Sequence, residues 1–262
     1  MASLTTYLDF PVSWSTRLMV ALRSVAKLLL KNPRALVRSL NVFAYGADAW
    51  SLKYLCWLGP LADFDADVVH CHFGPIADTY RVLSDILGIH HPWVTSLYGY
   101  DVSQVPGQKG RDVYRELARS CDRFFVMSED MRHRVVALGF PKEKVIVHPV
   151  GIDTDSVPFH ERTDHADPVK LVSVARLVEK KGIDDLIRAL AYARQHASRV
   201  LTCTVVGDGP LREQLHALAA ELDVDDMIRW TGYMQQEEML NELAAGDIYV
   251  QPSKTSQTGD ME

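Results

Sequence analysis

The most constraining feature of this sequence is a regular alternation of short β-rich runs with longer helical stretches, which begins near residue 66. Parallel strands need a crossover between them, and that crossover is usually a helix, so the alternation predicts βα units and parallel sheets. We expect an α/β fold with strands at 67–72, 93–97, 123–127, 145–148, 170–175, 201–206, 227–231 and 247–251.

The alternation falls into two blocks, separated by an irregular stretch at 150–168 that is rich in proline and acidic residues. A length of 262 residues also fits about two domains. We therefore predict one domain at 1–157 and a second at 158–262. Each is expected to be a Rossmann-like, doubly wound parallel sheet, in which ligands bind beyond the carboxyl ends of the strands.

Net charge and hydropathy exclude two broad classes of protein. The formal net charge is −6 and the isoelectric point is about 5.9, so no nucleic-acid partner is expected. No uncharged apolar run approaches the roughly 18 residues of a membrane-spanning helix. The charge is uneven, however, because residues 11–41 hold six basic residues and no acidic one.

The basic segment 14–40 is also apolar at helical spacing, and two interpretations of it stay open. One is a helix that packs on the core and exposes a solvated basic face. The other is a helix on a membrane surface, where the basic residues attract anionic lipid. The apolar positions that carry both interpretations are Trp14, Leu18, Leu22, Val25 and Leu29.

The cysteines indicate a reducing compartment. Cys56, Cys71, Cys121 and Cys203 form no C-x-x-C pair, and each has apolar neighbours, so buried free thiols are expected. The N-terminus lacks the basic region and apolar core of a secretory signal. A cytoplasmic protein is the expectation.

Two cations follow the first strand of the second block. Arg176 stands at the end of this strand, and Lys181 stands just before the Gly182 that opens the next helix. Cations beside a helix N-terminus favour a diphosphate, to which backbone N–H groups and the helix dipole add attraction. Arginine holds phosphate bidentately, and lysine acts as a mobile point charge. A solvated charged loop is the alternative.

Glycines follow the next strand of this block. Gly207 and Gly209 lack the third glycine of a dinucleotide-binding fingerprint, so by themselves they indicate a tight turn from strand to helix.

Polar residues also follow strands of the first block. His70 and His72 are expected to share one face of their strand, while Cys71 points away. No third group of ligands accompanies them, so no metal site is predicted, and His72 is the better candidate for a site residue. Gly99 permits a close backbone approach, and Asp101 either faces a cleft or caps a glycine turn.

Six motifs in a fixed order resemble the family 4 retaining glycosyltransferases of GT-B architecture, and among these the exopolysaccharide and colanic-acid-type sugar transferases. The resemblance covers roughly residues 66–262. The motifs are HCHFGP (70–75), LYGYDVS (97–103), VMSEDMRHRVVALGFPKEKVIVHPVGID (126–153), VARLVEKKG (174–182), VVGDGPL (205–211) and QPSKTSQTGDME (251–262).

The resemblance implies that the second domain binds a nucleotide-diphosphate sugar and the first binds the acceptor. Arg176 and Lys181 match the pair that clamps the diphosphate and stabilises it as it leaves, a catalytic role that elsewhere often falls to a metal. No metal and no cofactor is therefore expected. Gly207 and Gly209 match the turn beside the donor.

On the acceptor side, His72, Gly99 and Asp101 match positions that face the cleft. Tyr98 stands where many family members carry a histidine that positions the donor sugar and the transition state. Some exopolysaccharide relatives have a similar Tyr-Gly-Tyr-Asp run, so Tyr98 is included among the catalytic candidates.

The last motif holds Ser253 and Glu262 in the loop that the family places near the nucleotide and the sugar. Glu262 matches the first of two glutamates, and it is also a catalytic candidate. The second glutamate, the final strands and the closing helix do not follow, and no opening strand is evident before residue 66. We expect a fragment truncated at both ends, with an incomplete second domain, that is poorly stable and nearly inactive by itself.

The expected function of the parent protein is sugar transfer, with retention, from a nucleotide-diphosphate sugar to a growing, lipid-linked polysaccharide. The expected partners are the nucleotide sugar, this acceptor and an anionic membrane surface on the inner face of the membrane. A nucleotide-sugar 2-epimerase of the same architecture is an alternative, although the spacing of Arg176 and Lys181 follows the transferases. A non-catalytic pseudoenzyme is another, given Tyr98 and the missing second glutamate.

Overall fold

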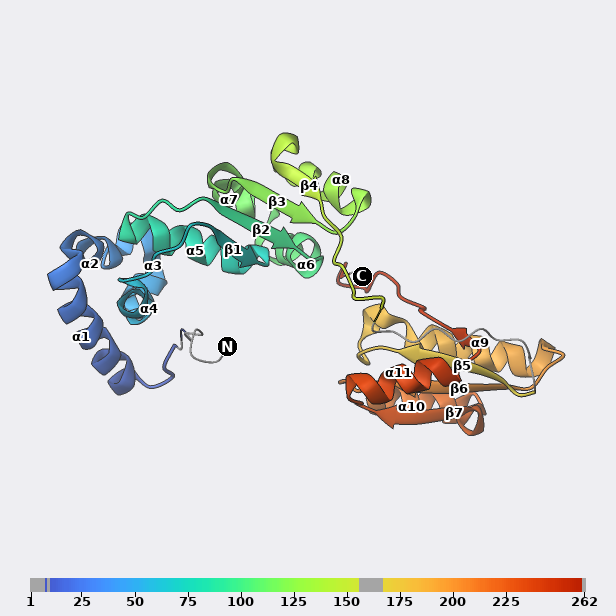
Figure 1. The fold of residues 1–262 in the computed structure, drawn as a ribbon. Coiled ribbons are helices and arrows are strands. Elements are labelled where there is room, and N and C mark those ends of the chain that lie inside the picture. The colour runs from blue at the N-terminus through green and yellow to red at the C-terminus, as the bar shows by residue number, and fades with distance from the viewer. Residues whose placement is uncertain (1–7, 9, 156–166, 261–262) are drawn as a thin grey trace. The chain divides into compact units, whose positions relative to one another are not determined.

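A computed structural model describes residue 8 and residues 10–155 and 167–260 of the chain. The chain divides into two compact units, Met1–Pro149 and Val150–Glu262. Each unit contains a four-stranded sheet in which all paired strands run parallel (Figure 1), so the predicted α/β class is confirmed. The predicted boundary between 157 and 158 lies outside the described residues.

The first sheet has the strand order β1-β2-β3-β4, and its helices pack against one face. Each new strand is added beside the previous one, always on the same side. Right-handed crossovers then place all the connecting helices on one face of the sheet. Within the described residues this sheet is therefore wound in one direction, and not doubly wound as expected. Its elements are β1 (Val69–His72), α5 (Gly74–Leu87), β2 (Trp93–Leu97), α6 (Tyr100–Lys109), η2 (Arg111–Tyr114), α7 (Arg115–Ser120), β3 (Arg123–Val126), α8 (Glu129–Ala137), η3 (Lys142–Lys144) and β4 (Val145–Val147).

In the described residues, four α-helices precede this sheet: α1 (Trp14–Lys31), α2 (Pro33–Ser39), α3 (Val42–Trp50) and α4 (Lys53–Leu61). The helical segment 14–40 breaks before Pro33, because proline has no N–H to donate and suits the first turn of a helix. The Asn32 side chain accepts a hydrogen bond from the Ala35 N–H and so caps the restarted helix.

Helix α1 packs on the core mainly through small residues, and most of the apolar stripe for which two interpretations were open stays exposed. Its buried residues are Ala21, Ser24 and Leu28, and a side chain on Gly59 of α4 would collide with Ser24. Small residues thus let the two helices approach closely. The larger apolar residues remain exposed, among them Trp14, Leu18, Leu22 and Leu29. Of the expected stripe, Val25 packs against the core, and the other four residues form an exposed apolar surface.

The second sheet has the strand order β7-β6-β5-β8. The chain adds β6 and then β7 on one side of β5, and it returns to place β8 on the other side. Right-handed crossovers then put α11 on the opposite face from α9 and α10, so this sheet is doubly wound as predicted. Its elements are β5 (Val169–Val174), η4 (Glu179–Lys181), α9 (Ile183–His196), β6 (Leu201–Val206), α10 (Arg212–Glu221), η5 (Asp225–Met227), β7 (Ile228–Gly232), α11 (Gln236–Ala245) and β8 (Ile248–Tyr249).

The packing of α1 is tested by two leucines of the same helix. Leu28 is fully buried, whereas Leu30 is 89% exposed. We expect Leu28→Ala to lower the free energy of unfolding by about 2–5 kcal/mol, because it leaves a cavity. Leu30→Ala is expected to change it by less than about 0.5 kcal/mol. Urea unfolding followed by tryptophan fluorescence checks both, and equal losses would contradict the assigned buried face.

Candidate functional site

The carboxyl ends of β5 and β8 form the place in the second unit where strand order reverses. In doubly wound sheets, ligands bind in the crevice at such a point. Arg176 follows β5, and Ser253 follows β8, so the topology brings these two predicted site residues to one sheet edge. We call the loops at 175–182, 207–211 and 250–260 the switch-point site.

The two predicted cations lie in the first of these loops. Arg176 is exposed, and within the described part of the chain its guanidinium has no hydrogen-bond or ion-pair partner. Lys181 is half-buried at the end of η4. Gly182 follows as the N-cap of α9, with a φ of 65° that favours glycine. The arrangement offers positive charge beside a helix N-terminus.

Gly207 and Gly209 pack the second loop against the first. A side chain on Gly207 would collide with the carbonyl of Ala175, and one on Gly209 would collide with that of Leu177. Leu177 also donates its N–H to the Asp208 carbonyl at 3.0 Å. These glycines therefore let the loop after β6 pack closely against the loop after β5, at the residues on either side of Arg176.

The third loop lies against the first as well. A side chain on Gly182 would collide with the Pro252 carbonyl, so backbone meets backbone here. The Ser253 hydroxyl is half-buried and accepts a hydrogen bond of 2.6 Å from the Gln251 amide. Glu262, the remaining candidate of this loop, lies outside the described residues.

Asp101 organises the corresponding edge of the first sheet. Its carboxylate is fully buried and accepts backbone N–H groups from Gly74 at 3.0 Å, Tyr98 at 3.0 Å and Gly99 at 2.9 Å. The expectation that it faces a cleft was wrong, because all of these contacts are internal, and the cap interpretation is the one that holds. Gly99 has a φ of 126°, which only glycine adopts readily.

His72 and Tyr98 meet at the same edge. The His72 Nδ1 atom lies 2.6 Å from the Tyr98 hydroxyl, and the tautomer decides which of them donates. His70 stacks on His72 with ring centroids 4.3 Å apart, and its Nε2 lies 2.8 Å from the Ser96 hydroxyl. Ser96 was not among the predicted site residues, although it lies opposite His72 in the sheet. Its place near the end of the strand expected at 93–97, two residues before Tyr98, is the signal in the sequence that points to it.

The predicted faces of β1 are confirmed, since the two histidines share one face and Cys71 is buried on the other. Burial lowers the pKa of His70, and the neighbouring His72 and His148 lower it further. The neutral ring therefore dominates at neutral pH. Among the described residues, no group of three or more His, Cys, Asp or Glu side chains is placed to hold a metal ion.

The four cysteines are free and buried, as predicted. Burial raises the pKa of Cys71 and of Cys203 to about 12 and that of Cys121 to about 11. These thiols stay protonated at neutral pH and therefore supply no nucleophile.

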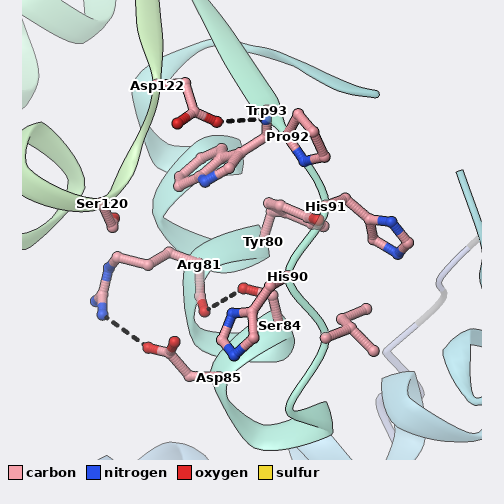
Figure 2. A pocket seen from close by; sticks show the side chains of 11 residues that line it. Tyr80, Arg81, Ser84, Asp85, His90, His91, Pro92, Trp93, Ser120 and Asp122 are labelled. Atoms are coloured by element: carbon pink, nitrogen blue, oxygen red, sulfur yellow. Dashed lines mark hydrogen bonds and ion pairs between the residues drawn. The ribbon is translucent and has the colours of Figure 1, made fainter. Parts of the chain in front are cut away.

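A cavity of about 420 Å³ in the first unit lies away from these loops. Figure 2 shows that Arg81 and Asp85 pair at its wall, and that the Asp122 carboxylate accepts the Trp93 N–H. Trp93 begins β2 and Asp122 immediately precedes β3, so the cavity lies at the amino ends of the strands. It belongs to the edge opposite His72 and Tyr98.

The role of Asp101 is tested by removing its charge. Asp101→Asn replaces one acceptor oxygen by an NH₂ group that faces backbone donors, so we expect a loss of about 2–4 kcal/mol in the free energy of unfolding. Asp112→Asn, at an exposed ion pair, is the control and should cost less than about 1 kcal/mol. Tryptophan fluorescence during urea unfolding reports mainly the first unit, which holds Trp14, Trp50, Trp57 and Trp93. Equal losses of unfolding free energy in the two variants would contradict the role of Asp101 as a cap.

Comparisons with known proteins agree with this layout. The chain is 29% identical over 234 residues to the amylovoran biosynthesis glycosyltransferase AmsK of Erwinia amylovora, which covers 86% of this chain and 56% of that protein. It is also 29% identical over 233 residues to the putative colanic acid biosynthesis glycosyltransferase WcaL of Escherichia coli K12, with the same two coverages. The chain thus spans little more than half the length of these relatives.

Solved structures share the fold. The Anabaena protein HepE, in complex with UDP-glucose, matches with a TM-score of 0.60 and 18% identity, over 79% of this chain and 58% of that one. The lipopolysaccharide outer core galactosyltransferase WaaB matches with a TM-score of 0.53 and 19% identity, over 76% and 53%. Both are likenesses of fold to GT-B glycosyltransferases.

The family follows from matches to both units. Residues 19–151 match the Glycosyl transferase 4-like domain, which is just over half of the chain. Residues 158–260 match the Glycosyl transferases group 1 family. The relatives AmsK and WcaL are exopolysaccharide and colanic acid glycosyltransferases. The motifs, the parallel sheets and these matches lead to one conclusion: the chain belongs to the family 4-like, group 1 glycosyltransferases of GT-B fold.

Proposed function

We propose that this chain is part of a retaining glycosyltransferase that takes a hexosyl group from a nucleotide-diphosphate sugar. The observation that carries the proposal is the position of Arg176 and Lys181 at the point of strand reversal. The structural neighbour HepE, in complex with UDP-glucose, supports a nucleotide sugar as the donor. The anomeric configuration of the product, read by NMR, tests retention.

The proposed chemistry is electrostatic. As the bond from sugar to diphosphate breaks, negative charge grows on the leaving oxygens. Arg176 holds them with fixed N–H donors, and Lys181 adds a mobile charge, so both stabilise the transition state more than the ground state. These two residues supply the positive charge in this proposal, and no metal is assigned to the site.

We assign the acceptor to the first unit. There the His72–Tyr98 pair presents an imidazole and a phenol at the carboxyl ends of β1 and β2. A lipid-linked polysaccharide is the proposed acceptor. Support comes from the amylovoran and colanic acid relatives, and from a Mycolicibacterium smegmatis phosphatidylinositol monomannoside mannosyltransferase that is 29% identical over 178 residues.

Helices α1 and α2 are proposed to rest on an anionic membrane at its inner face. Exposed apolar side chains gather on them, at Trp14, Leu18, Met19, Leu22, Leu29, Leu30 and Val37. Arg23 and Arg34 are exposed beside these and have no hydrogen-bond or ion-pair partner in the described structure. Apolar area together with basic charge is what binds a helix to anionic lipid. No helix in the described residues is long and apolar enough to cross a membrane.

Donor binding is tested by removing the two cations. Isothermal titration of the purified chain with UDP, GDP and ADP identifies the preferred nucleoside diphosphate. We expect Arg176→Ala/Lys181→Ala to weaken that binding by at least about 30-fold, since two charge-assisted contacts are lost. Arg188→Ala, at an exposed arginine of α9, is the matched control and should bind like the wild type. Unchanged binding in the double variant would contradict the assignment.

A donor screen separates transfer from the other activities. In a version of the protein extended beyond Glu262, nucleoside diphosphate should be released from one of UDP-glucose, UDP-galactose or GDP-mannose only when a lipid-linked acceptor is supplied. Interconversion of the free nucleotide sugar without acceptor would instead indicate an epimerase. Binding of nucleoside diphosphate without any release would indicate a pseudoenzyme.

Membrane attachment is tested by flotation with vesicles of phosphatidylcholine, with and without phosphatidylglycerol. We expect binding only when the anionic lipid is present. Arg23→Gln/Arg34→Gln should weaken it by about 10- to 30-fold, at about 1 kcal/mol for each basic residue. Arg188→Gln, in the second unit, should leave it unchanged. Equal binding to neutral vesicles would contradict the electrostatic part of the proposal.

A further inference from the structure

Lys254 lies where the third loop of the switch-point site meets helix α9. Its ammonium group is 2.6 Å from an Asp184 carboxylate oxygen and 2.8 Å from one of Asp185. Its backbone N–H donates to the Lys180 carbonyl at 2.8 Å. One residue thus contacts both the loop that carries Lys181 and the first turn of the helix behind it.

The first turn of α9 creates an electrostatic conflict at this site. The N-terminus of a helix attracts anions through its free N–H groups and its dipole. Here, however, Asp184 and Asp185 occupy that first turn and follow Lys181 by only three and four residues. Two uncompensated carboxylates would repel an incoming diphosphate. The only ion pairs that the structure gives these carboxylates, within its described residues, are those with Lys254.

We infer that Lys254 is a positioning residue for the donor: by pairing with Asp184 and Asp185 it offsets part of their negative charge and so lets Arg176 and Lys181 attract the diphosphate. The inference rests on the proposed function, since it takes the ligand of the switch-point site to be a diphosphate. Neither the spacing of the motif nor its glycines pointed to Lys254, because the partners lie about 70 residues earlier in the chain.

Lys254 carries its charge throughout the neutral range. Burial lowers the pKa of Lys254, but the hydrogen bonds to Asp184 and Asp185 outweigh this and raise it above its usual value. The ion pairs are partly exposed, so their direct contribution to stability is small. We therefore look for the effect of Lys254 in ligand binding and not in folding.

Other contacts hold the third loop without Lys254. The Gln257 N–H donates to a Glu179 carboxylate oxygen at 2.8 Å, and Lys180 pairs with Asp260 at 3.2 Å. The loop also lies against Gly182 through Pro252. Because these contacts persist when the charge of Lys254 is removed, an electrostatic role can be separated from an anchoring role.

The test compares three variants of the chain by isothermal titration with the preferred nucleoside diphosphate and with the matching nucleoside. We expect Lys254→Met to weaken diphosphate binding by about tenfold, through two unscreened carboxylates, and to leave nucleoside binding within twofold of the wild type. Lys254→Arg should keep diphosphate binding within about twofold, because it keeps the charge. The triple variant Asp184→Asn/Asp185→Asn/Lys254→Met should recover it to within about threefold, since the repulsion goes with the carboxylates.

Two results would overturn the inference. One is wild-type diphosphate affinity in Lys254→Met. The other is a triple variant that binds as weakly as Lys254→Met while circular dichroism shows it folded, because the lost function would then be anchoring. If the wild-type chain binds none of UDP, GDP and ADP, it is the proposed function that fails. The wild-type titration therefore distinguishes the two failures.

Discussion

The second unit depends on one topological constraint, the reversal of strand order at β5. Right-handed crossovers force the chain to place helices on both faces once β8 is added beside β5, and a crevice opens where the directions diverge. Residues that follow β5 and β8 are then neighbours, although Arg176 and Ser253 are far apart in the sequence. The first sheet has no such reversal within its described residues, so its polar side chains gather at the ends of successive strands and not around a crevice.

Glycines turn this topology into a compact site. At Gly182, Gly207 and Gly209 a side chain would collide with the backbone of a neighbouring loop, so each marks a place where two backbones touch. Two of these contacts, at Ala175 and Leu177, hold the backbone on either side of Arg176. In the first unit a carboxylate does similar work, because Asp101 gathers three backbone N–H groups from the ends of β1 and β2. In both units, contacts that hold the loop backbone determine where the side chains of the site begin.

Strand positions, the glycine turns and the two cations could be predicted because they depend on local patterns and on short spacings. The rest depended on partners that are distant in sequence. The apolar stripe at Leu18 and Leu22 was identified with two interpretations open, and its exposure is visible only in the folded unit, where Ala21 is buried and Ser24 packs on Gly59. The two roles left open for Asp101 were likewise decided by a contact with Gly74, and the strand reversal is a property of spatial order that no spacing records.

Electrostatic balance explains why acidic residues stand so close to a proposed anion site. Asp184 and Asp185 stabilise the first turn of α9 through the helix dipole, yet the same charges would oppose a diphosphate. A cation that pairs with both carboxylates reduces this repulsion. Lys254 is that cation, and it lies in the loop after β8, the strand that neighbours β5. The charge that favours the ligand thus depends on the loop after β8 lying against the loop after β5. The proposed affinity of this unit for a diphosphate is therefore expected to change with the packing of these two loops.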